Sequence, residues 1–169
     1  MLAEHLVARA PARHTSRMDR QTELAAQLQD YILEHIPLAH AMQLRVARYD
    51  GTQLEMTAPL APNINDKGCA FGGSLASLMT LTAWGLVDLN LRERGLACDI
   101  YVGDSSLLYL QPLLDDLHAT ARYTQRGSFP DFLETLSRKG KARIAVSCIV
   151  DAANGDAATL EAAFVAKSR

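Results

Sequence analysis

The stretch that decides the fold is residues 71–95, which read FGGSLASLMTLTAWGLVDLNLRERG. From 72 to 93, apolar side chains recur almost all the way round a helix, and most of the charged ones gather in its last turn. A helix that is apolar on every side is covered on every side. The stretch therefore predicts a long central helix that begins at Phe71-Gly72-Gly73 and ends before Gly95, a residue suited to a C-terminal cap.

Alternating apolar and polar residues predict strands on both sides of this helix. Before it, a helix is expected over 19–36, with Asp19 as N-cap, followed by strands over 42–46 and 53–56 joined by the turn Asp50-Gly51. After it, the pattern predicts strands over 98–110, 117–124, 141–150 and 160–166, a short helix over 130–139 and a hairpin turn at Asn154-Gly155. Strands joined mostly by tight turns form an antiparallel sheet.

The fold class that follows is α+β, a hotdog arrangement in which one curved antiparallel sheet wraps around the central apolar helix. Such a sheet leaves one side of the helix open, so we expect a partner subunit to close it, as a homodimer or a dimer of dimers. With 169 residues the chain is long enough for one domain, assigned to 19–169. Residues 1–18 are expected to form a disordered tail.

Composition excludes several classes of protein. A formal net charge of -2 gives no electrostatic footprint for nucleic acid. Residues 69–87 carry no charge, but their hydroxyl side chains and three glycines, with strands on either side, favour a buried helix over a membrane span. Three cysteines without a C-x-x-C pair or a Cys/His cluster predict neither disulfides nor a metal site, and they favour the reducing cytoplasm.

The run with chemical content is Asn63-Ile64-Asn65-Asp66-Lys67-Gly68-Cys69-Ala70-Phe71-Gly72-Gly73-Ser74-Leu75. It delivers the chain into the N-terminus of the central helix, where unpaired N–H groups and a partial positive charge can hold an anion or a developing oxyanion. Two glycines there allow a ligand to approach the backbone. Alternatively, the glycines serve only close packing, and the asparagines only shape the loop.

This run resembles the hotdog thioesterases, in which an Asn, a Gly and a His-Gly-Gly precede the central helix. It is more similar to the YiiD C-terminal thioesterase group, which has Phe-Gly-Gly-Ser instead. The resemblance extends over 99–112, where a Tyr and a Pro close the segment, and covers roughly residues 20–168. It implies an acyl-CoA or acyl-carrier-protein thioester as substrate, with coenzyme A as part of that substrate and no other cofactor.

The resemblance also implies site residues. Asn65 matches the asparagine that positions the thioester or the attacking water, and Gly72 matches the glycine whose N–H donates to the thioester carbonyl. Phe71 stands where many relatives have His, and Thr80 stands where many have the catalytic Asp or Glu. The substrate-binding set expected at the same place is Asn63, Phe71, Gly73 and Ser74.

Thioester hydrolysis needs a group that activates water, and a hydroxyl without a base does this poorly. Either Thr80 orients water or another carboxylate acts. We expect Asp104 to be that base, since mid-strand apolar neighbours would desolvate it and raise its pKa. Alternatively, Asp104 lies on a solvent-exposed strand face, and the Thr80 hydroxyl bonds back to the preceding helical turn.

The coenzyme A phosphates need cations, and Lys139, Lys141 and Arg143 cluster around Gly140. In similar enzymes a basic segment near this strand start meets the nucleotide, although such clusters are also common as solvated strand edges. The sequence therefore predicts a thioesterase. Loss of both the His and the carboxylate favours a second candidate, a non-catalytic acyl-CoA binding or sensing protein. A hydratase would need an Asp and a His together at the helix start, and no His lies between His40 and His118.

Overall fold

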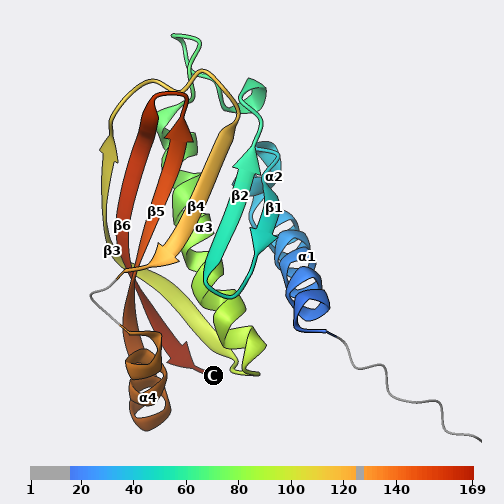
Figure 1. The fold of residues 1–169 in the computed structure, drawn as a ribbon, viewed down its shortest axis with the longest axis vertical. Coiled ribbons are helices and arrows are strands. Elements are labelled where there is room, and N and C mark those ends of the chain that lie inside the picture. Colours follow the sequence, from blue (N-terminus) through green and yellow to red (C-terminus); the bar gives the residue numbers. More distant parts are fainter. Residues whose placement is uncertain (1–15, 125–127) are drawn as a thin grey trace, which may run out of the picture.

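A six-stranded antiparallel sheet curves around one long helix, α3 (Figure 1). The computed structural model describes residues 16–124 and 128–169. The sheet order is β1-β2-β4-β5-β6-β3. The strands are β1 (Arg45–Tyr49), β2 (Gln53–Ala58), β3 (Cys98–Tyr109), β4 (Leu117–Tyr123), β5 (Lys141–Ala152) and β6 (Gly155–Ser168), and the helices are α1 (Arg17–His35), α2 (Pro37–Ala41), α3 (Gly72–Glu93) and α4 (Phe129–Lys139). This confirms the predicted hotdog fold and the bounds of its central helix.

Helix α3 is held against the sheet over most of its surface, and Leu78, Met79, Leu86 and Leu89 are fully buried. Gly85 lies at a close approach of α3 to its neighbours, because a β-carbon there would lie 2.8 Å from Leu54 in β2 and 3.1 Å from Leu28 in α1. A glycine inside a helix costs about 1 kcal/mol of helix stability. The close packing of α3 between the sheet and α1 accounts for its presence.

The N-terminal part differs from the prediction in two ways. Helix α1 begins at Arg17, with Ser16 as N-cap, and Asp19 is the third helical residue of a capping box rather than the cap. The predicted tail boundary at 18 therefore falls inside the first turn, while the prediction for residues 1–15 lies outside the described residues. Pro37 ends α1 but also begins α2, so β1 starts at Arg45 instead of 42.

The two edges of the sheet are built differently. Strand β1 is short, carries Arg45 and Arg48, contains a register shift and has α1 against it. Strand β3 is twelve residues long and exposed along most of its length, including Tyr101 (61%) and Val102 (50%). Charges, bulges and covering elements protect sheet edges from further pairing. Strand β3 has the bulge and two carboxylates, Asp99 and Asp104, each of which is paired with an arginine.

A bulge interrupts β3 at Gly103. Val102 pairs with Phe164 of β6, but the next paired residue of β3 is Asp104, opposite Ala163. The extra residue reverses the alternation of β3. Before the bulge, even-numbered residues face α3, and after it the odd-numbered residues Ser105, Leu107 and Tyr109 do, because they pair with Ala162, Leu160 and Ala158 of the buried core.

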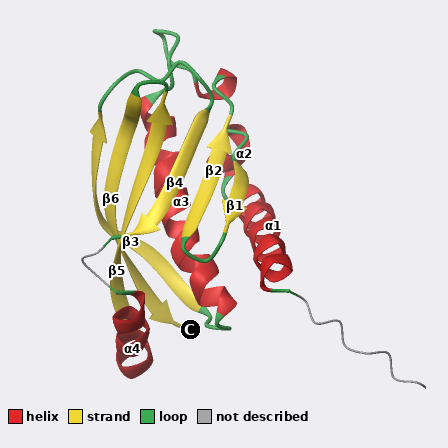
Figure 2. Cartoon of the chain, viewed as in Figure 1, coloured by secondary structure: helices red, strands yellow, loops and turns green. Residues whose placement is uncertain are grey.

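The loops that end the strands gather at the end of the molecule where α3 begins (Figure 2). They are the segments 59–71 and 110–116 and the β5–β6 hairpin. The described residues include no helix long and apolar enough to cross a membrane. Within residues 16–124 and 128–169, no group of His, Cys, Asp and Glu side chains lies close enough together to hold a metal ion.

Candidate active site

The first turn of α3 is the centre of the candidate site. Its N-cap is Phe71, whose side chain makes no capping hydrogen bond. Leu75 N–H donates to Phe71 O at 3.1 Å, as the helix requires, and within the described residues no protein acceptor is found for the N–H groups of Gly72, Gly73 and Ser74. These three donors, with the partial positive charge of the helix end, can receive a carbonyl oxygen.

Two aromatic rings cover the two glycines. A β-carbon at Gly73 would lie 2.3 Å from the ring of Phe71, and one at Gly72 would lie 3.3 Å from the ring of Tyr109. The Tyr109 hydroxyl also donates to Gly72 O at 2.9 Å. Both rings remain 55% exposed, so they form walls of an open surface rather than part of the core. A side chain at either glycine would have to displace one of these rings.

Asn63 anchors the loop before the helix. It is 1% exposed, and its side-chain amide donates to Met42 O at 3.0 Å and to Pro59 O at 2.7 Å. Its backbone carbonyl accepts from Phe71 N–H at 2.7 Å, which fixes the entry into α3. The side-chain oxygen is buried and has no hydrogen-bond partner within the described residues. Asn63 therefore holds the loop of the site in place, and its side-chain oxygen can still accept a hydrogen bond.

Asn65 is engaged in its own loop. Its side-chain oxygen accepts from Lys67 N–H at 2.8 Å and Cys69 N–H at 3.3 Å, and its amide lies 3.2 Å from the Cys69 sulfur. These contacts form an Asx turn of the kind that shapes a loop. Both asparagines thus shape the loop, which was the alternative to a direct role in the site. The role of Asn65 in catalysis stays a prediction.

Thr80 lies on a half-buried stripe of α3 with Gly73, Ser77 and Trp84, spaced so that they share one helix face. Ser77 and the buried Thr82 each donate to a carbonyl one turn earlier, at 2.8 and 2.7 Å. No such bond is found for Thr80 within the described residues. Its hydroxyl is therefore available to a ligand or a water molecule, in contrast to the back-bonded alternative.

Asp104 does not lie in the predicted environment. Its side chain is 68% exposed on the outer face of the sheet, where it forms an ion pair with Arg143 of β5. The expectation of a desolvated carboxylate is wrong, because the bulge at Gly103 directs Asp104 away from α3. Within one chain it also lies five residues from Tyr109, roughly 17 Å along the strand. Its part in catalysis stays untested.

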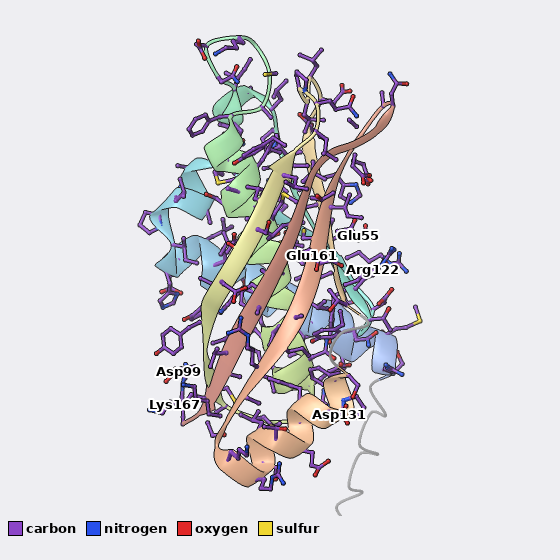
Figure 3. The ribbon with its side chains drawn as sticks, turned by 90° about the vertical axis from the view of Figure 1, so that its left-hand side faces the viewer. Glu55, Asp99, Arg122, Asp131, Glu161 and Lys167 are labelled. Atoms are coloured by element: carbon purple, nitrogen blue, oxygen red, sulfur yellow. The ribbon has the colours of Figure 1, made fainter. Side chains whose placement is uncertain are left out.

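The predicted phosphate ligands lie at the opposite end of the sheet from Gly72. Lys139 ends α4, and Lys141 begins β5 opposite Lys167 of β6. Figure 3 shows Lys167 beside Asp99 at that end. Tyr109 pairs with Ala158, nine residues before Lys167, which corresponds to roughly 30 Å. Lys139, Lys141 and Arg143 therefore do not meet the first turn of α3 in their own chain.

The surface around Gly72 is instead apolar and acidic. Ile64, Leu110 and Leu114 are at least half exposed there. The adjoining loops and strand ends carry five aspartates, Asp66, Asp115, Asp116, Asp151 and Asp156. Lys67 pairs with Asp66 at 3.0 Å. The site therefore offers backbone donors and apolar walls, with little positive charge of its own.

Sequence reasoning did not assign Tyr109 to the site. The run Leu107-Leu108-Tyr109-Leu110-Gln111-Pro112 contains it, but the pattern does not say that its ring reaches across to α3. Trp84 was also missed, and its indole N–H donates to Ile100 O of β3 at 3.2 Å. Both contacts join α3 to the edge strand β3. They depend on the tertiary fold, so a local sequence pattern does not reveal them.

Comparison with solved structures gives close matches of fold. A Chlorobaculum tepidum protein of unknown function is 28% identical, with a TM-score of 0.83, over 88% of this chain and 97% of the other. A Shewanella oneidensis "putative thioesterase" is also 28% identical, with a TM-score of 0.78, over 86% and 99%. Thioesterase HI1161 of Haemophilus influenzae, 12% identical over 85% and 90% with a TM-score of 0.66, shares the fold.

A family model described as "Putative thioesterase (yiiD_Cterm)" matches residues 25–168. The match includes the loop of Asn63 and Asn65, the whole of α3 and the edge strand with Tyr109. It therefore spans every element that forms the site. The chain belongs to the YiiD C-terminal thioesterase family.

Proposed function

We propose that this protein hydrolyses thioesters that join an acyl group to a phosphopantetheine arm, carried by coenzyme A or by an acyl-carrier protein. The observation that carries the proposal is the uncapped first turn of α3, whose glycines lie under Phe71 and Tyr109. Hydrolysis proceeds through an oxyanion, and preorganised backbone donors are an effective way to stabilise it. No further cofactor is proposed, since coenzyme A enters as part of the substrate.

The proposed roles are those that the family resemblance implies and that the positions of the residues support. The Gly72 N–H donates to the thioester carbonyl oxygen, Gly73, Ser74 and Phe71 surround the group, and the buried Asn63 holds the loop that positions them. Water attacks the carbonyl carbon, the C–S bond breaks, and the leaving thiolate takes the proton that the water gives up, so that a carboxylic acid and a thiol are released. Thr80 orients the water, and Asn65 is the second candidate for this task. Asp104 is kept as the candidate base only if a second chain brings it to the site.

A hydroxyl is a weak substitute for a carboxylate, so we expect slow turnover compared with relatives that carry one. A thiol-release assay across short, medium and long acyl-CoAs, and with an acyl-carrier protein, tests the proposal. Thr80→Ala should lose turnover while Thr82→Ala, a matched hydroxyl facing the core, should keep it. Turnover with no substrate would remove the hydrolase assignment.

The second candidate is a non-catalytic acyl-CoA binding or sensing protein. What favours it is the exposed Phe71 and the half-buried Thr80 at the two positions where a histidine and a carboxylate are expected. This candidate predicts that acyl-CoA raises the melting temperature without release of thiol. Thiol release that depends on Thr80 would contradict it.

We further propose that the protein acts in the cytoplasm as a homodimer or a dimer of dimers. Three free cysteines are compatible with a reducing compartment. The exposed edge strand β3 and the half-buried stripe of α3 supply an open side for a partner. Sedimentation of the purified chain measures the oligomeric state.

A further inference from the structure

A pocket lies toward the end of α3 that is opposite the candidate active site. Its volume is about 230 Å³, and its lining comes from α1, the second half of α3, the start of β3 and Arg169. A second pocket of about 560 Å³ adjoins it and shares five lining residues with it, including Asp88 and Arg92. Asp88 follows Gly72 by 16 residues (88 − 72), which corresponds to about 24 Å along the helix. Within one chain the pocket is therefore separate from the first turn of α3.

Three aromatic side chains line this pocket, and two of them form its walls. The indole N–H of Trp84 donates to a backbone carbonyl of β3 at 3.2 Å, which fixes this ring between the helix and the strand. Tyr31 is already engaged, since one ring stacks on it at 4.4 Å and the Arg92 guanidinium lies 5.4 Å from its centre. Tyr101 is exposed, and its ring has no aromatic or cationic contact within the described part of the chain. An open tyrosine face beside a fixed indole suits a flat aromatic ligand.

Asp88 contributes a buried carboxylate to the pocket. The residue is 7% exposed, and Arg92 Nε lies 2.6 Å from its Oδ2. The two side chains form an ion pair, but this oxygen is buried and has no hydrogen-bond partner among the residues that the structure describes. A buried acceptor without a hydrogen bond is destabilising, and an N–H group of a ligand would satisfy it. Asp88 therefore favours a ligand that presents N–H donors.

Arg169 adds an accessible cation to the same pocket. Its Nε lies 2.7 Å from Asp99 Oδ1, and 63% of its side chain stays exposed. A guanidinium has five N–H donors, so one contact with Asp99 leaves others free for a phosphate or a carboxylate. The charged side chains of the pocket are two acids and two bases, Asp88, Asp99, Arg92 and Arg169. This arrangement suits a ligand with donors on one edge and an anionic group elsewhere.

We propose that this pocket binds a fused heteroaromatic ring with adjacent N–H donors, the 2-amino-4-oxopyrimidine edge that guanine and pterins share. The ring lies on Tyr101 beside Trp84, its N–H groups donate to Asp88, and the anionic group of the ligand binds Arg169. Two adjacent donors match the two oxygens of one carboxylate. Adenine has an acceptor nitrogen next to its amino group, so it would place a lone pair against a carboxylate oxygen. The pocket therefore distinguishes guanine from adenine.

Trp84 makes binding at this pocket directly observable, because it is the single tryptophan of the chain. A ring beside the indole should change its fluorescence, and calorimetry on the full-length protein gives the affinities for GMP, pterin-6-carboxylate and AMP. GMP or the pterin should bind about tenfold more tightly than AMP, or better. The tighter of the two identifies the source of the ring. Binding of AMP as tight as both, or no binding of any of the three, would overturn the proposal.

Asp88→Asn tests the carboxylate. The variant keeps the size of the side chain and removes a buried charge, but one acceptor oxygen becomes an NH₂ group that opposes the donors of the ligand. Affinity for the preferred ring should fall by about tenfold or more. Asp30→Asn makes the same change at an exposed position of α1 that lines neither pocket, and it should leave the affinity unchanged. Unchanged affinity in Asp88→Asn, or equal loss in both variants, would reject the site.

Two more variants divide the ligand into its ring and its anionic group. Tyr101→Ala should weaken guanosine and GMP alike, because it removes the stacking surface. Arg169→Ala should weaken GMP and leave guanosine unchanged, because only GMP carries a phosphate. If the pterin is the tighter ligand, pterin-6-carboxylate and unsubstituted pterin take the same places. An equal loss for both members of a pair in Arg169→Ala would contradict the assigned orientation.

Coenzyme A distinguishes this pocket from the candidate active site. The preferred ring should remain bound when coenzyme A is added at a saturating concentration, since the two sites lie apart on α3. Displacement of the ring by coenzyme A would show that the pocket belongs to the substrate site and would overturn its separate assignment. Thiol release has no bearing on this result, so the hydrolase can fail while the pocket stands, and the reverse.

Discussion

The hydroxyl of Tyr109 donates to the carbonyl oxygen of Gly72 at 2.9 Å, so the edge strand β3 is tied directly to the first residue of the central helix. This bond orients the first peptide units of α3 and holds an aromatic wall over Gly72. Any change at the end of β3 is therefore expected to reach the site.

Tyr109→Phe removes this bond and leaves the ring. We expect stability to fall by about 0.5–1 kcal/mol, because the hydroxyl is partly solvated. Affinity for coenzyme A thioesters should fall more clearly as the first turn loosens. Urea unfolding and calorimetric titration give the two quantities. Ser106→Ala, which removes a hydroxyl from the outer face of the same strand, is the control and should leave both unchanged.

Gly73→Ala tests the packing of Phe71. The new methyl group would lie 2.3 Å from the ring, so the ring must swing away from the helix. Ligand affinity should fall, while stability changes little because Phe71 is 55% exposed. The double variant Gly73→Ala/Phe71→Ala removes the clash. If Gly73→Ala leaves the ligand affinity unchanged, the ring does not pack as described.

Thr80→Ala and Thr82→Ala are expected to have opposite effects. Thr82 is fully buried and donates to Leu78 O at 2.7 Å, so its loss should reduce stability by about 1 kcal/mol with turnover retained. The Thr80→Ala variant should lose turnover with little change in stability. Thermal unfolding and thiol release measure the pair. Equal turnover in the two variants would exclude Thr80 from the mechanism.

Asp104→Ala removes an exposed ion pair with Arg143, so stability should change by less than about 0.5 kcal/mol. We expect thiol release to survive, because the carboxylate faces away from α3. Loss of turnover in a folded protein would return Asp104 to the mechanism as a base. Ser106→Ala, on the same outer face, controls for a general effect on the edge strand.

Asp88 should make stability depend on pH. Burial raises the pKa of its carboxyl despite the neighbouring Arg92, so the folded state holds this proton more tightly than the unfolded state. The free energy of unfolding should therefore fall as pH rises from about 3.9, the unfolded value, through the raised folded value. Asp88→Asn lacks this loss, so its stability relative to wild type should increase over that range. A relative decrease would mean that Arg92 outweighs burial.

The sequence predicted the parts of the fold that depend on local periodicity and on turn residues. The helix over 72–93, the hairpin at Asn154-Gly155 and the short helix before Gly140 are all present. It missed α2, because Pro37 reads equally as a stop and as the first residue of a new helix. At the N-terminus, Ser16 and Asp19 are both suitable caps, and spacing favours Ser16 only once the capping box is formed.

The site was less accessible to sequence reasoning. The loop and the glycines could be found because a motif is a local feature. The orientation of Asp104 could not, because one extra residue at Gly103 turns the following side chains to the other face, and alternation across a bulge reads as an ordinary strand. The distance of Lys141 from Gly72 also depends on strand order, which hydropathy does not reveal.

The contact between Asn63 and Met42 has a consequence for how the protein can be shortened. The amide of Asn63 donates to the carbonyl of Met42, the C-cap of α2, so the loop before α3 is fastened to the N-terminal helical pair. The two N-terminal helices thus support the loop that is proposed to bind the ligand. A chain trimmed to begin after α2 would keep every residue of the site and lose the anchor that fixes their place.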